Sequence, residues 1–448
     1  MAFRKMLKNG KIRSIVSESW SVSWAMTFIM FFIFLIGLAD VFIAGRFGKE
    51  VQAAYGLSFQ LYFIFLIFAM AISVGTVSVV SRMFASAQRE EIRTAISSSF
   101  ITILIVGGIL AAAGMAITDN IINALRAPEA TKSYAISFIG IYSAGIIFHY
   151  IMMNTNAILR ACNMVRKSLW TMFIVCFLNI GLNFYLSFFT PLKFRGIAVS
   201  TVISLIIGSV INIYHVMRFT GGISGVSVLV IKKITHISWP AGVLQVLWQL
   251  GSMALFMILS RLPRFNVETM AAFTNGLKIE SAIFLPAFAF NMANAVVVGN
   301  LLGKKKEEDA FHGGILTAMI GVSIVTVLTA VVMLNARTIA SILSNDPAVI
   351  DRSVQYILIT LLFEPFMAWG VILGGGLNGA GDTKSVMVIV SLSIWLLRVP
   401  LSYLLGIHFG CGAIAVWWCM NLSILAQSLF LTRRYFSKRW ITLARANI

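Results

Sequence analysis

Long apolar runs alternate with short polar breaks along the whole chain. Crossing the hydrocarbon core of a bilayer takes about 20 apolar residues in a helix, and every run reaches that length. The pattern predicts an all-α membrane protein in which each run forms one transmembrane helix. We expect twelve spans, at roughly 22–44, 53–80, 95–118, 134–157, 169–190, 196–217, 238–260, 270–302, 313–335, 350–376, 386–407 and 411–432.

The two halves of the chain repeat each other at an offset of 218 positions. Phe47 matches Phe265, Glu50 matches Glu268, and the charged residue Glu90 after the second run matches Glu308. Each half holds six predicted spans, so both copies enter the membrane in the same direction. Such repeats are related by a pseudo-two-fold axis along the membrane normal. We therefore predict an N-terminal six-helix lobe at 1–218, a linker at 219–236 and a C-terminal six-helix lobe at 237–448.

The predicted linker contains the glycine-rich stretch 221–225, which suits a flexible connection. Two lobes flanking a central cleft favour a secondary transporter that rocks between two states over a channel.

Composition agrees with a membrane protein and excludes several other classes. Of the 448 residues, 59% are hydrophobic and only 11% are charged, and the mean hydropathy is +0.91. No break between spans is long enough for a soluble ATPase domain, and no phosphate-binding loop motif is present. The four cysteines show no paired spacing and fall in or beside apolar runs, so we expect them to be small core residues. Scattered histidines give no support for a metal centre, and nothing indicates an enzyme.

The positive net charge of +19 has an explanation within the membrane topology. More than twice as many Lys and Arg residues fall on the side of the N-terminus as on the opposite side. Cytoplasmic loops carry such an excess, so both termini are predicted to be cytoplasmic, and no nucleic-acid partner is needed.

Asp40 is the one clear ionisable residue within the predicted spans of the first lobe. Asn179 and Asn183 lie on one face of the fifth span, and Thr201 lies near the start of the sixth. All four fall in the outer half of the membrane, which predicts a shared oxygen-rich pocket. Such a pocket could hold Na⁺ directly, or Asp40 could carry a proton.

The second lobe has four charged residues inside its spans. Lys278 and Glu280 lie in the eighth span, Glu364 in the tenth and Arg398 in the eleventh. Two acids and two bases favour internal ion pairing that fixes helix packing, although Glu364 and Arg398 could also line a substrate cleft. Phe and Met are abundant and would suit lipophilic cations.

The sequence resembles the multidrug and toxic compound extrusion (MATE) family. The resemblance rests on the twelve spans, on Asp40 at the end of the first span, and on three motifs: 297–303 (VVGNLLG), 378–384 (NGAGDTK) and 398–400 (RVP). It implies antiport of organic, often cationic drugs against H⁺ or Na⁺ in a prokaryotic plasma membrane. It also implies no cofactor, contact with membrane lipid, and action as a monomer.

The resemblance implies that Asp40, Asn179, Asn183 and Thr201 form the cation site. Related proteins often carry an aspartate where this chain has Asn183. The NorM-like branch has acids in spans seven and ten where this chain has Trp248 or Gln249 and Met367, so the DinF-like branch is the nearer match.

The sequence also allows two other classes of function. A flippase for lipid-linked or amphipathic substrates shares the architecture and would be favoured by a basic cavity. A passive channel or a scaffold would not need Asp40.

Overall fold

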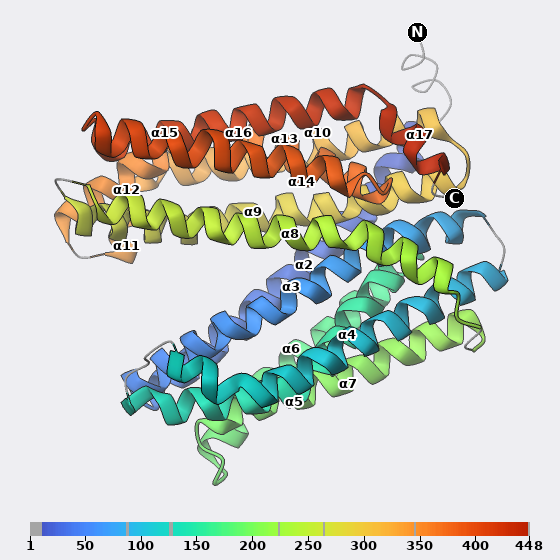
Figure 1. Ribbon diagram of the computed structural model, residues 1–448, viewed down its shortest axis with the longest axis horizontal. Helices are drawn as coiled ribbons and strands as arrows, with labels where there is room; N and C mark the ends of the chain where they lie inside the picture. Colours follow the sequence, from blue (N-terminus) through green and yellow to red (C-terminus); the bar gives the residue numbers. More distant parts are fainter. Residues whose placement is uncertain are drawn as a thin grey trace. The chain divides into compact units, whose positions relative to one another are not determined.

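The computed structural model describes residues 11–86, 89–124, 129–222, 225–262, 265–344 and 346–446. Within these ranges every regular element is a helix (Figure 1). The first ten residues and positions 223–224 of the predicted linker lie outside the described residues.

Among the described residues, twelve helical segments are long and apolar enough to cross a membrane. Each overlaps one predicted run, so the all-α, twelve-span prediction is confirmed. The segments are Ser19–Arg46, Glu50–Ala85, Arg89–Ala116, Thr131–Ala161, Val165–Phe188, Arg195–Thr220, Val228–Ser260, Val267–Gly303, Glu307–Leu334, Pro347–Gly379, Thr383–His408 and Gly412–Phe436.

The chain forms two compact units. The N-terminal unit is Trp24–Gly242, and the C-terminal unit combines the residues up to Ser23 with those from Val243 onward. The lobes proposed at 1–218 and 237–448 stay a prediction, since the compact units divide the chain at other positions, within two helices. These helices are α2 (Lys11–Arg46) and α8 (Val228–Ser260).

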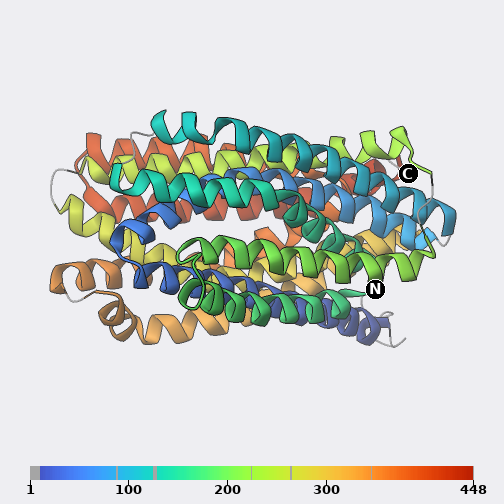
Figure 2. The same cartoon turned by 90° about the horizontal axis from the view of Figure 1, so that it is seen from below.

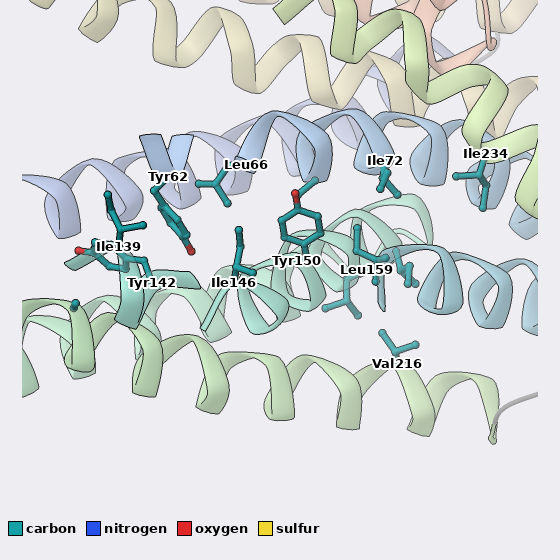
Figure 3. Close-up of a cluster of buried hydrophobic side chains, with 14 of the residues drawn as sticks. Tyr62, Leu66, Ile72, Ile139, Tyr142, Ile146, Tyr150, Leu159, Val216 and Ile234 are labelled. Carbon is teal, nitrogen blue, oxygen red and sulfur yellow. The ribbon is translucent and has the colours of Figure 1, made fainter. Parts of the chain in front are cut away.

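The N-terminal unit is built around α5 (Glu129–Ala161), which packs against four other helices. They are α3 (Lys49–Ser86), α4 (Arg89–Ala124), α6 (Val165–Phe188) and α7 (Arg195–Thr220). Figure 3 shows the core between them, in which Tyr62, Tyr142 and Ile146 lie close together. Ile234, from the start of α8, belongs to the same core. The described end of the predicted linker is therefore packed on this unit and is not a free connection.

In the C-terminal unit the long helices run side by side (Figures 1 and 2). Helix α13 approaches α9 closely because a Cβ atom at Gly375 or Gly379 would overlap the backbone of α9 at Asn291 or Ala295. Small residues four apart permit such packing between membrane helices. The elements are α9 (Asn266–Gly303), α10 (Glu307–Leu334), α11 (Ala336–Leu343), α12 (Pro347–Thr360), η1 (Leu361–Phe363), α13 (Glu364–Gly379), α14 (Thr383–Leu392), η2 (Ser393–Arg398), α15 (Val399–Tyr403), η3 (Leu404–His408), α16 (Gly412–Phe436) and α17 (Arg439–Ala446).

Two of these spans are not regular α-helices throughout. The tenth passes through the 3₁₀ turn η1 immediately before Glu364 and Pro365, because proline disfavours helical geometry in the preceding residues. The eleventh contains two π-helical turns, and Arg398 ends the first of them. Both irregular segments therefore place a charged residue at a break in the helix, a common feature of functional sites.

The expectation that all four cysteines are core residues is wrong for one of them. Cys162, Cys176 and Cys419 are buried, whereas Cys411 is exposed. Cys411 follows Gly410, which has a positive φ of 67°, in the turn that leads into α16. The apolar run ends at this turn, so the thiol is not covered by other helices.

Candidate functional site

Asp40 lies near the end of α2 and is only 4% exposed. The amide Nδ2 of Asn183 donates a hydrogen bond of 2.6 Å to its Oδ1. The hydroxyl of Tyr55 donates one of 3.2 Å to its Oδ2. Three helices, α2, α3 and α6, thus meet at one carboxyl group.

Asn179 lies one turn before Asn183 on the same face of α6, and both are buried. Its Nδ2 donates to Oγ1 of Thr201 on α7 at 3.2 Å, and the Thr201 hydroxyl donates to the carbonyl of Ile197 at 3.0 Å. The Oδ1 atom of Asn179 is buried and has no hydrogen-bond partner. The structure therefore brings the four predicted residues together as two hydrogen-bonded pairs, one turn apart, with one amide oxygen unused.

Tyr55 is a site residue that the sequence pattern did not identify. A tyrosine near the end of a span is usually an interfacial anchor, and its sequence position did not distinguish it from one. Its ring stacks on Phe59 and meets the edge of Phe138 at 5.8 Å. Burial among these rings directs the hydroxyl to the carboxyl group.

No positive charge balances Asp40. Among the described residues, no Lys, Arg or His nitrogen lies within 4.0 Å of its carboxylate, and both hydrogen-bond donors are neutral. A buried carboxylate normally requires a proton, a counter-ion or a metal ion. The arrangement can therefore accept a small cation or a proton.

The C-terminal unit holds a second polar cluster. The hydroxyl of Tyr356 on α12 donates a 2.7 Å hydrogen bond to Oε1 of Glu280 on α9. Arg398 donates from Nε to the hydroxyl of Ser423 on α16 at 2.8 Å. Glu364 is 3% exposed, and its Oε2 atom is buried without a partner.

The predicted ion pairing of these charges is not what the structure shows. Lys278 is exposed, because it lies two residues from Glu280 and therefore on another face of α9. No ion pair within 4.0 Å joins Arg398 to Glu280 or Glu364 in the described residues, and Arg398 instead bonds to Ser423. Glu364 and Arg398 are nevertheless both buried, and Glu280 is partly buried.

The two clusters are not copies of each other. At the repeat offset, Asp40 corresponds to Ile258 and Glu280 corresponds to Tyr62. The hydroxyl of Tyr62 lies 2.8 Å from Nδ1 of His149, so a tyrosine hydrogen-bonded to a histidine stands at the position of Glu280. Each unit therefore has its own polar chemistry on a shared helical framework. No group of three or more His, Cys, Asp or Glu residues suited to a metal ion occurs in the described parts of the chain.

Three comparisons place the chain among known transporters. A probable multidrug resistance protein NorM of Thermotoga maritima is 25% identical over 91% of this chain and 89% of its own length. The uncharacterized transporter YisQ of Bacillus subtilis is 22% identical over 96% and 95%. A solved MOP superfamily transporter from Pyrococcus furiosus, described as having a binding pocket of reverse polarity that suggests a different function, has the same fold. It matches with a TM-score of 0.88 at 18% identity, over 95% of this chain and 97% of its own.

The MatE family model matches the chain twice, at residues 25–185 and 240–404. The two segments cover more than half of the sequence, and each half of the repeat contains one match. Members are transporters and not enzymes, and the name of the Thermotoga maritima relative describes multidrug resistance. On this evidence, and with the fold in agreement, the chain belongs to the MatE family.

Proposed function

We propose that this protein is a secondary active multidrug exporter that exchanges organic, often cationic compounds for H⁺ or Na⁺. One observation carries the proposal: Asp40 is buried against neutral donors and has no positive partner in the described part of the chain. An ionised carboxylate in such a place is costly unless a proton or a cation neutralises it, and intramembrane acids of this kind mark ion pathways. The unused Oδ1 of Asn179 would supply a further oxygen to a bound cation.

Binding at Asp40 acts through its hydrogen bonds. An ionised carboxylate accepts from both Asn183 and Tyr55, whereas a protonated carboxyl has one donor and fewer acceptor positions. Taking up a proton therefore changes how α2 is held to α3 and α6. A cation that binds one arrangement more tightly shifts the population of states, and this coupling releases the drug and drives the lobes between their orientations.

The test is efflux from proteoliposomes with H⁺ and Na⁺ gradients imposed separately. One pH unit supplies about 1.4 kcal/mol per proton, enough for a tenfold substrate gradient. We expect drug movement with at least one gradient and its loss in Asp40→Asn. Glu50→Gln is the matched control, since Glu50 lies at the start of α3 and is not part of the site. The proposal is overturned if the efflux rate does not depend on either gradient, or if Asp40→Asn transports as fast as the wild type.

We assign the buried cluster of the C-terminal unit to substrate contact. Glu364 has no hydrogen-bond donor, so its carboxylate can receive the positive group of a drug, while Arg398 also lies over the ring of Trp248 at 5.7 Å. Lys278 is too exposed to belong to this group. Glu364→Gln should raise the KM for cationic drugs more than for neutral ones.

Three further assignments complete the proposal. The basic residues support a plasma-membrane location with both termini in the cytoplasm. The absence of acids at Trp248, Gln249 and Met367 supports the DinF-like branch. The self-contained site in the N-terminal unit supports action as a monomer.

The second candidate is a flippase for lipid-linked or amphipathic substrates. Two buried arginines in the N-terminal unit, Arg82 and Arg160, favour it, since such substrates carry phosphate. Transport of a fluorescent lipid analogue in the same proteoliposomes, without drug efflux, would select this function.

A further inference from the structure

Arg82 is a buried guanidinium near the end of α3 and is 5% exposed. Its Nε donates to the carbonyl of Ser78 at 2.8 Å, and its Nη2 donates to the Ser78 hydroxyl at 3.2 Å. Its Nη1 atom is buried without any partner. Both bonds go back to the preceding turn of its own helix, so the Nη1 side of the planar guanidinium group makes no hydrogen bond.

No carboxylate balances this charge. The buried charged residues of the N-terminal unit, in its described part, are Asp40, Arg82 and Arg160. Asp40 on α2 bonds to Tyr55 on α3. Arg82 lies 27 residues after Tyr55 on α3, a distance of about 40 Å at 1.5 Å per residue. The acid and Arg82 are therefore at opposite ends of the unit.

Arg160 brings a second guanidinium to the level of Arg82. Helices α3 and α5 pack together, and Thr76 on α3 donates to Oδ1 of Asn154 on α5 at 2.9 Å. Each arginine lies six residues beyond its member of that pair, in the direction of its helix's C-terminus. Two guanidinium groups are thus buried at the end of the unit opposite Asp40.

A structural role explains only part of this geometry. An arginine that bonds to the carbonyl and the hydroxyl of the preceding turn is held in place by its own helix, which accounts for Nε and Nη2. It does not account for Nη1, because buried polar groups are nearly always hydrogen-bonded and buried charges are nearly always paired. Guanidinium groups bind phosphate and carboxylate through two parallel hydrogen bonds, which requires a free edge.

We propose that Arg82 is the centre of an anion-binding site in the N-terminal unit that takes a phosphate group. The Nη1 atom of Arg82, which has no partner among the described residues, donates to the phosphate oxygens. The phosphate belongs either to the headgroup of an anionic phospholipid or to a soluble phosphate compound. This site is separate from Asp40 and does not depend on the coupling ion.

The test measures thermal unfolding of the purified, delipidated protein in an uncharged detergent. One arm titrates inorganic phosphate against chloride at constant ionic strength. The other compares nanodiscs of phosphatidylcholine with and without phosphatidylglycerol, and native mass spectrometry counts the retained lipid. The variants are Arg82→Gln, Arg82→Lys and the control Arg218→Gln, whose arginine is exposed near the end of α7.

We expect wild type and Arg218→Gln to be stabilised by phosphate, by phosphatidylglycerol or by both. Arg82→Gln should lose this stabilisation. Arg82→Lys keeps the positive charge but not the planar guanidinium group, and should bind the anion about tenfold more weakly. Without anion, Arg82→Gln should unfold at the same temperature as wild type or higher, because it removes an unpaired buried charge. A purely structural arginine would give the opposite result.

The arm that responds identifies the source of the phosphate. No anion effect on wild type in either arm overturns the proposal, as does an equal effect in Arg82→Gln. If Arg82→Gln does not fold, Arg82→Lys decides: binding equal to wild type overturns the proposal, and weakened binding supports it.

Discussion

The amide of Asn183 donates a 2.6 Å hydrogen bond to Asp40, across 143 positions of sequence. The bond joins the end of the first span to the fifth span, and Ser187 in turn donates to Oδ1 of Asn183 at 3.3 Å. The amide oxygen is therefore occupied while its nitrogen serves the carboxylate. In a chain with an aspartate in place of Asn183, two acids would meet here.

Replacing Asn183 with aspartate should make stability depend on sodium. Two carboxylates at this separation repel each other unless they share a proton or a cation, and Na⁺ prefers such oxygens. We expect the Tm of Asn183→Asp to be several degrees higher in NaCl than in KCl at equal ionic strength, and the wild type to differ less. Asn183→Ala, which adds no charge, is the control. Equal melting in both salts for Asn183→Asp would contradict the expectation.

Tyr55→Phe should weaken coupling without abolishing it. The variant removes one of two donors to Asp40 and keeps the ring that packs on Phe138. Hydrogen bonds to charged groups contribute about 1.5–3 kcal/mol, so the external pH giving half-maximal efflux should shift upward, since the ionised form of Asp40 loses a stabilising donor. Efflux rates across a series of external pH values provide the measurement. Tyr185→Phe, at an exposed tyrosine on α6, should leave the curve in place.

Much of this site could be predicted from the sequence because depth in a membrane can be counted along a span. Counting residues placed Asp40, Asn179, Asn183 and Thr201 at one level. The count could not predict which of these residues hydrogen-bond to each other, because that depends on the rotation of each helix about its own axis. That same rotation exposes Lys278 on the surface of α9 and directs Arg398 to Ser423. Tyr55 was missed for lack of any signal that separates a buried hydroxyl from an interfacial one.

Gly379→Ala should destabilise the C-terminal unit. The added methyl group would overlap the carbonyl of Ala295, a backbone atom that cannot move aside as a side chain can. Overpacking of this kind costs about 1–3 kcal/mol. Gly181→Ala is the matched control, because a Cβ atom at that helical glycine meets nothing within 4 Å. Thermal unfolding in detergent should show a lower Tm for Gly379→Ala alone, and equal values for both variants would argue against the close packing of α13 on α9.

Cysteine labelling tests both the fold and the orientation. Burial raises the pKa of the Cys162 thiol to about 12, so at pH 8 it is almost wholly protonated, and maleimides react with the thiolate. Cys411 is exposed in the turn before α16, on the side opposite the termini if those are cytoplasmic. A membrane-impermeant maleimide added to intact cells should therefore label the wild type but not Cys411→Ser, and Cys162 should become reactive only after unfolding. Labelling of Cys411 that requires broken cells would reverse the proposed topology, and labelling of Cys162 in the folded protein would contradict its packing.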